Sequence, residues 1–124
     1  MGTVDIYRRE AGAVLVLEIS GRVDNDGAAT LEDVLSHALR EGKHHLVLDM
    51  GKVTSLNSSG LRVLAGILTH ARAAGGDLVI AALTGRVERV FEIIGFAQHF
   101  HVTPDAMQGI QKFREGHPPS NDGQ

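Results

Sequence analysis

The chain has 124 residues, enough for one compact domain with its own hydrophobic core and too few for two. Its formal net charge of -3 argues against sequence-independent binding of nucleic acid, and its zero cysteines exclude a disulfide framework and a thiolate nucleophile. No apolar run approaches the roughly 18 residues of a membrane span, and residues 1–10 lack the apolar core of a signal peptide, so we expect a cytoplasmic protein without membrane insertion.

The first part of the chain predicts a β-hairpin followed by a helix. Residues 3–9 and 14–19 have the composition of strands and are separated by a short segment that contains glycine. The second strand is expected to end in the polar loop 20–27, after which apolar residues recur at helical spacing until Gly42 stops the helix after about Glu41. These apolar residues are Ala28, Leu31, Val34, Leu35, Ala38 and Leu39.

The central segment changes from a strand pattern to a helix pattern. An apolar run at 46–50 predicts a buried strand, which a polar turn should connect to Asn57-Ser58-Ser59-Gly60. A helix is predicted from there to Ala74, just before Gly75-Gly76, with its buried face formed by Leu61, Leu64, Ile67, Leu68 and Ala71. The small polar residues therefore lie at a helix N-terminus, where unpaired N–H groups and the helix dipole favour a phosphate.

The last third of the chain predicts two more strands and two more helices. An apolar strand at 78–82 precedes a helix for which Thr84 is the expected N-cap and Gly95 the end. The buried face of that helix would hold Val87, Val90, Phe91 and Ile94. A short edge strand at 99–102 and the sequence Thr103-Pro104-Asp105 should open a final helix that buries Ala106, Ile110 and Phe113.

This order of elements predicts an α/β fold with one domain over 1–115 and a disordered tail over 116–124. The sheet should be mainly parallel, with four to five strands, an N-terminal antiparallel hairpin and about four helices. In such sheets the loops that follow the strands share one edge. Asp24, the turn at 57–59 and Thr84-Gly85 are therefore expected to lie together.

Three enzyme or ligand classes do not fit this edge. Neither Ser58 nor Ser59 has the flanking glycines of a nucleophile elbow, and none of the seven histidines falls in the three edge loops. His99 and His101 share a strand face but supply only two metal ligands, and neither common phosphate-loop pattern occurs. We therefore expect no catalytic residue, no metal and no cofactor.

The turn itself has a simple interpretation and a functional one. A capping residue is worth about 1 kcal/mol and occurs at very many helices. Capping needs only one side chain, so Asn57-Ser58-Ser59-Gly60 leaves at least one hydroxyl free to face solvent. Gly60 would also leave room for another protein's active site. The pattern favours a serine that can be modified.

Three segments resemble the STAS domain found in bacterial anti-sigma factor antagonists. Residues 48–49 and 57–61 are similar to the family signature, an apolar strand that ends in Asp and then Asp-Ser-Ser/Thr-Gly-Leu at a helix start. Residues 19–24 resemble its Gly-Arg-Leu-Asp loop, and residues 90–96 resemble the end of its third helix. The likeness extends to about Phe113.

The resemblance implies a phosphorylation-controlled partner switch. Such a protein binds an anti-sigma factor kinase and so releases a sigma factor, which controls transcription, and a serine phosphatase acts on its phosphorylated form. The family's phosphorylated position corresponds to Ser59, with Ser58 as the alternative. The implied partner surface comprises Asp24, Asn57, Ser58, Ser59, Gly60, Leu61 and Arg62.

One position departs from the family pattern. Asn57 stands where the family usually has Asp, so it keeps the capping ability and loses the charge. Two further interpretations stay open at this point. The chain could be a non-switching STAS scaffold subunit of a stressosome-like signalling assembly or a membrane lipid-transport assembly, and it could form a weak homodimer.

Overall fold

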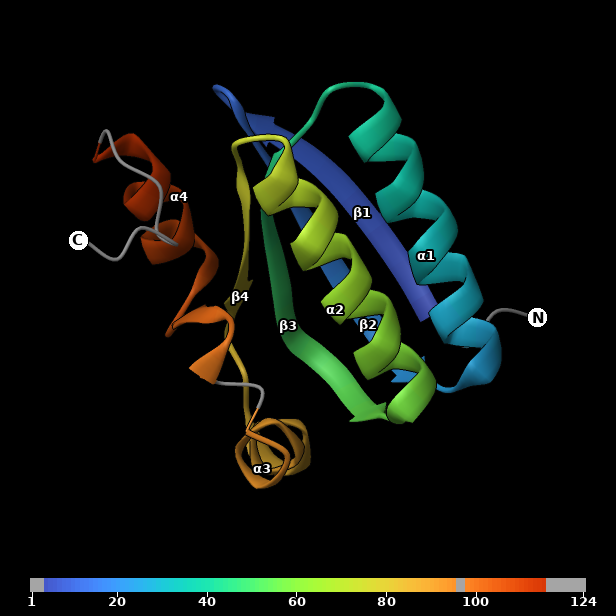
Figure 1. Cartoon of the computed structure of the whole chain (residues 1–124). Coiled ribbons are helices and arrows are strands. Elements are labelled where there is room, and N and C mark those ends of the chain that lie inside the picture. Colours follow the sequence, from blue (N-terminus) through green and yellow to red (C-terminus); the bar gives the residue numbers. More distant parts are fainter. Residues whose placement is uncertain (1–3, 96–97, 116–124) are drawn as a thin grey trace.

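One mixed sheet and the helices on its two faces form the fold (Figure 1). The computed structural model describes residues 4–95 and 98–115, so the predicted tail lies outside the described residues. The elements in chain order are β1 (Val4–Ala11), β2 (Val14–Val23), α1 (Asn25–Arg40), β3 (His45–Leu56), α2 (Ser58–Ala73), β4 (Asp77–Ala81), α3 (Gly85–Ile93), β5 (His101–Thr103) and α4 (Ala106–Arg114).

The strands lie in the order β1-β2-β3-β4-β5. β1 and β2 pair antiparallel as a hairpin, and the other neighbours pair parallel. The predicted α/β fold with an N-terminal hairpin and a mainly parallel sheet is therefore confirmed. None of the helices in the two described stretches is long and apolar enough to cross a membrane.

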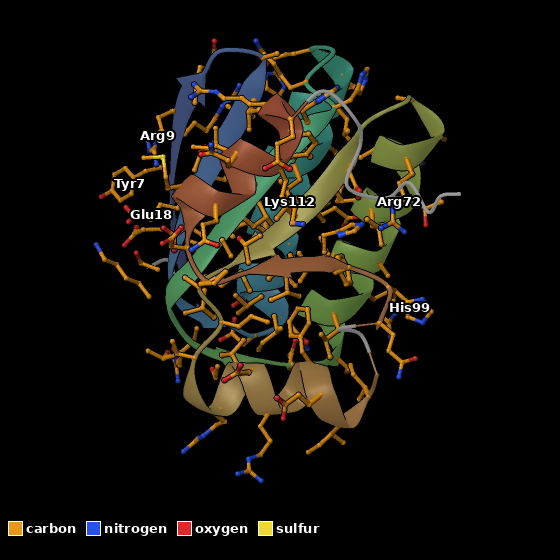
Figure 2. All side chains as sticks on the ribbon, turned by 90° about the vertical axis from the view of Figure 1, so that its left-hand side faces the viewer. Tyr7, Arg9, Glu18, Arg72, His99 and Lys112 are labelled. Atoms are coloured by element: carbon orange, nitrogen blue, oxygen red, sulfur yellow. The ribbon has the colours of Figure 1, made fainter. Side chains whose placement is uncertain are left out.

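Two apolar layers explain why the central strands are apolar without alternation. Leu46 and Leu48 of β3 belong to a large buried cluster with α1, α2 and α3, whereas Val47 between them packs with Ala106 and Ile110 of α4. Strands that are covered on both faces are apolar throughout. Seen from the α4 side, Figure 2 shows Tyr7 and Glu18 projecting from the hairpin beside α4.

The main correction concerns the ends of β2 and β3. The polar loop predicted from residue 20 is strand as far as Val23, and the polar turn predicted before Asn57 is strand as far as Leu56. These segments pair with each other, with register shifts along the way, up to Val23 opposite Leu56. β4 ends opposite Asp49, so β4 does not pair with the part of β3 that belongs to this extension. The polar residues of the extension are polar because the strands are exposed there, and they do not mark a turn.

Three local predictions at helix ends also change. Thr84 occupies the N-cap position of α3 but makes no side-chain cap bond. Thr103 ends β5, and Asp105 caps α4 instead, where its Oδ1 accepts a hydrogen bond from the Gln108 amide at 2.8 Å. Ile94, expected to be buried, is 46% exposed because α3 has already ended at Ile93.

Candidate functional site

The N-termini of α1 and α2 lie side by side because the strands that lead into them are neighbours. β2 and β3 end as a pair, and the Asn57 amide donates to the Val23 carbonyl at 3.1 Å. Asp24 caps α1 by accepting from the Gly27 amide at 2.9 Å, and Asn57 caps α2 by accepting from the Gly60 amide at 3.1 Å. Two capped helix starts therefore form one polar surface.

Asn25, the first residue of α1, joins the two helix starts. Its Oδ1 accepts one hydrogen bond from Ser59 Oγ at 2.7 Å and another from Asn57 Nδ2 at 3.0 Å. The sequence prediction did not include Asn25, because nothing local indicates partners more than thirty residues away along the chain. The hydroxyl of Ser59 is thus held in place by a side chain of the neighbouring helix.

The predicted site residues differ in their exposure. Asn57, Ser58 and Arg62 are exposed, and Ser59 is partly buried. Gly60 and Leu61 are buried, and the side chain of Leu61 belongs to the core cluster. These two residues therefore offer little surface in the unbound chain, and their contact with a partner stays a prediction.

The role of Gly60 also changes. A Cβ built on Gly60 would lie 2.6 Å from Leu56 Cδ1 and 2.7 Å from Val23 Cγ1. The glycine lets α2 approach the ends of β2 and β3 closely, which sets the position of Ser59. The sequence pattern suggested that Gly60 leaves room for another protein, but the space beside it is filled by Leu56 and Val23.

The expected third loop is absent from this surface. Thr84 follows β4, which ends opposite Asp49, well before β3 reaches Leu56. Asp49 itself lies within β3, and its Oδ1 accepts from the Gly51 amide at 3.0 Å. The strand register therefore brings neither Thr84 nor Asp49 to the serine turn, and two segments form the site rather than three.

A groove of about 230 Å³ runs between the two helix starts. Its polar lining comes from Asn25 and Glu32 of α1 and from Ser59 and Arg62 of α2, and Ala28, Ala29 and Val63 complete it. No histidine is among the residues that line it. Among residues 4–95 and 98–115, no group of three or more His, Asp or Glu side chains is arranged to hold a metal ion.

Comparison with known proteins identifies the family of this fold and site. Residues 6–104 match the family model described as "Mlab, STAS domain". The chain belongs to the STAS domain family.

Individual relatives agree with that assignment. BtrV of Bordetella bronchiseptica, named as an anti-sigma factor antagonist, is 31% identical over 105 residues, which is 85% of this STAS chain and 90% of BtrV. The crystal structure of an anti-sigma factor antagonist from Mycobacterium paratuberculosis has a TM-score of 0.82 at 22% identity, covering 90% of this chain and 94% of that one. The Bacillus cell fate determinant SpoIIAA in its phosphorylated form has a TM-score of 0.71 at 15% identity, covering 89% and 100%. At these identities the two structures support the fold alone.

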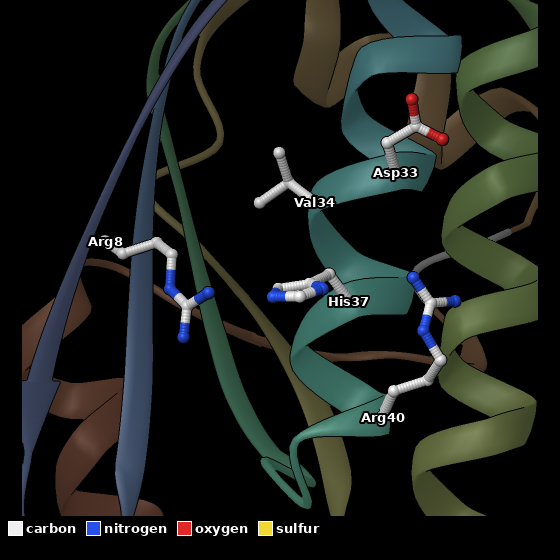
Figure 3. A pocket seen from close by; sticks show the side chains of 5 residues that line it. All are labelled: Arg8, Asp33, Val34, His37 and Arg40. Atoms are coloured by element: carbon white, nitrogen blue, oxygen red, sulfur yellow. The ribbon is translucent and has the colours of Figure 1, made fainter.

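A second hollow of the STAS domain, of about 430 Å³, lies between β1 and α1 (Figure 3). Arg8, Asp33, Val34, His37 and Arg40 line it. Glu41 bridges two of these groups, with Oε1 2.9 Å from Arg8 Nη2 and Oε2 3.0 Å from His37 Nε2. The hydrogen bond from Arg8 lowers the pKa of the Glu41 carboxyl. This hollow lies toward the C-terminal half of α1, away from the capped start that holds Ser59.

Proposed function

We propose that this STAS domain is an anti-sigma factor antagonist that switches partners through phosphorylation of Ser59. The unmodified chain binds an anti-sigma factor kinase, which frees a sigma factor, and the phosphorylated chain is released. It acts by binding rather than by catalysis, in the cytoplasm. The observation that carries the proposal is the Ser59 hydroxyl, held at a polar surface where two helix starts meet.

The relatives support the choice of partner class. BtrV and several staphylococcal proteins, among them one from Staphylococcus epidermidis, are named as anti-sigma factor antagonists. SpoIIAA, which has the same fold, has been solved in unphosphorylated and phosphorylated forms. A serine phosphatase that hydrolyses the phosphoester of Ser59 would reset the switch.

The chemistry of the modification disturbs the site locally. The kinase transfers the γ-phosphoryl group of ATP to Ser59 Oγ, the hydroxyl proton goes to a base of the kinase, and ADP leaves. The modified Oγ can no longer donate to Asn25 Oδ1, because it carries phosphorus in place of hydrogen. A charge of about -1.5 to -2 then stands beside the Glu32 carboxylate, with which Ser59 shares the groove.

The size of the effect is sufficient for a switch without refolding. Each 1.4 kcal/mol of lost affinity weakens binding about tenfold, so a penalty of a few kcal/mol removes the partner. The helix dipole offsets the new charge by about 0.3–1 kcal/mol, and neutral Asn57 adds no repulsion. The domain can therefore stay folded while its surface changes.

Variants of the two serines test the proposal. We expect Ser59→Ala to bind the anti-sigma factor kinase of the same genome within about threefold of the parent chain, and Ser59→Asp to bind at least about tenfold more weakly. Ser58→Asp is the matched control, since Ser58 is the adjacent exposed hydroxyl. Equal binding by Ser59→Ala and Ser59→Asp would refute the switch. A loss confined to Ser58→Asp would move the modification to Ser58.

A non-switching STAS scaffold remains the second candidate, and Asn57 is the observation that favours it. Asn57 departs from the Asp of the family signature, and its Nδ2 donates to Asn25 Oδ1, a bond that a carboxylate cannot make. Intact mass after incubation with the kinase and ATP separates the candidates. A single added phosphate supports the switch, and an unchanged mass supports the scaffold. The weak homodimer is a separate proposal, which sedimentation at several concentrations tests.

A further inference from the structure

Arg62 is a cation of the serine groove to which the family resemblance assigns only a place on the partner surface. It is exposed, it lines the groove together with Ser59, and it has no ion-pair partner within 4.0 Å among residues 4–95 and 98–115. Arg8 and Arg72, by contrast, are each paired with a carboxylate. Glu32 lines the same groove from α1 and still forms no salt bridge with Arg62.

The spacing along α2 places Arg62 within reach of a group attached to Ser59. Residues three apart on a helix are neighbours on one face, with about 5–6 Å between their Cβ atoms. Ser59 and Arg62 have this spacing, and both side chains border the groove. A guanidinium on a long side chain matches phosphate oxygens with paired N–H donors, and charge-assisted bonds of this type are about twice as strong as neutral ones.

We propose that Arg62 is the intramolecular partner of the phosphate on Ser59. The inference rests on the proposed function and deepens it, because Arg62 then sets how much of the phosphate charge reaches the partner protein. In the phosphorylated chain the guanidinium donates to phosphate oxygens over the groove. Asn25 Oδ1 loses the hydrogen bond from Ser59 Oγ and keeps the one from Asn57 Nδ2.

The test uses the full chain with phosphoserine inserted at position 59 during synthesis, so that no kinase is needed. Phosphorus NMR follows the second ionisation of the phosphate, which is near pH 6 in an isolated phosphoserine. A nearby cation stabilises the dianion and lowers that pKa. We expect the pKa of the phosphate to rise by about 0.5 pH unit in Arg62→Gln.

Arg86→Gln is the matched control, because Arg86 is an exposed cation at the start of α3 rather than α2. It removes the same charge and should leave the phosphate pKa unchanged. The Glu32 carboxylate lines the same groove and is present in the parent chain and in both variants, so the difference in phosphate pKa isolates Arg62. Arg62→Lys should keep part of the shift. Equal pKa values in Arg62→Gln and Arg86→Gln would overturn the inference.

The outcome is separable from that of the proposed function. Failure of a kinase to phosphorylate Ser59 would remove the switch, while a pKa difference confined to Arg62→Gln would still establish the phosphate pair in the inserted phosphoserine. Phosphorylation by the kinase together with identical titrations would leave the switch and overturn the role of Arg62. Because Arg62 is exposed, urea unfolding should show the same stability for both unphosphorylated glutamine variants.

Discussion

Two glycines in the same helix should respond oppositely to alanine. Gly60 and Gly66 both lie in α2, but a Cβ on Gly60 would meet Leu56 and Val23 at 2.6 and 2.7 Å, whereas a Cβ on Gly66 meets nothing within 4 Å. Carbon atoms pack best at about 3.5–4.0 Å, so the alanine methyl at position 60 is too close to both side chains by about 1 Å.

The magnitudes follow from overpacking and helix propensity. Overpacking a core costs about 1–3 kcal/mol, and replacing glycine by alanine in a helix gains up to about 1 kcal/mol. Gly60→Ala should therefore lower the free energy of unfolding by about 1 kcal/mol, and Gly66→Ala should raise it by about 0.5–1 kcal/mol. Leu56 and Val23 are both buried, so they have little room to move away.

Urea unfolding measures both variants against the parent chain. The linear slope, about 1–3 kcal/mol per molar urea for small proteins, converts the midpoint shift into a free-energy difference. A Gly60→Ala variant at least as stable as Gly66→Ala would refute the close approach of α2 to the paired strand ends. It would also remove the argument that this approach positions Ser59.

Two further predictions concern charged groups outside the serine groove. Arg72→Met should destabilise the domain by about 2 kcal/mol, because it leaves the fully buried Asp77 carboxylate without the cation that lies 3.1 Å away. The loss is smaller than for a fully buried pair, since the Arg72 side chain is 34% exposed. Urea unfolding should show this loss but less than about 0.5 kcal/mol for the exposed control Arg86→Met, and equal stabilities would contradict it. Burial lowers the pKa of His45 below 6.5, the nearby His44 lowers it further, and Asp77 opposes both effects. The imidazole of His45 therefore takes up a proton less readily in the folded state than in the unfolded state. The contribution of neutral His45 to the free energy of unfolding should be fully present above about pH 6.5 and be lost as the pH falls through the folded pKa. Thermal unfolding at several pH values should therefore show a flatter dependence of stability on pH for His45→Phe. The same dependence in the parent chain and in His45→Phe would contradict the role of His45.

Local patterns were sufficient for much of the fold. The apolar runs around Leu48 and Ile80, the helical spacing after Gly60 and the glycines after the first three helices are properties of short segments, so they predicted the order of elements. They also predicted a cap at Asn57 or Ser58, because capping involves residues three apart, and the structure shows that Asn57 provides it. The resemblance at residues 57–61 rests on the same local signal.

Other features depended on which strand ends pair in space. Residues 20–23 and 51–56 contain polar residues typical of turns, and pairing with neighbouring strands, including each other, makes them strands. The same pairing brings Asn25 to Ser59, buries Gly60 and separates Asp49 from the serine turn. The sequence by itself determined the type of each element and the serine turn. The tertiary structure decided what surrounds Ser59, because hydrogen bonds and close packing between distant segments leave no periodic trace in either segment.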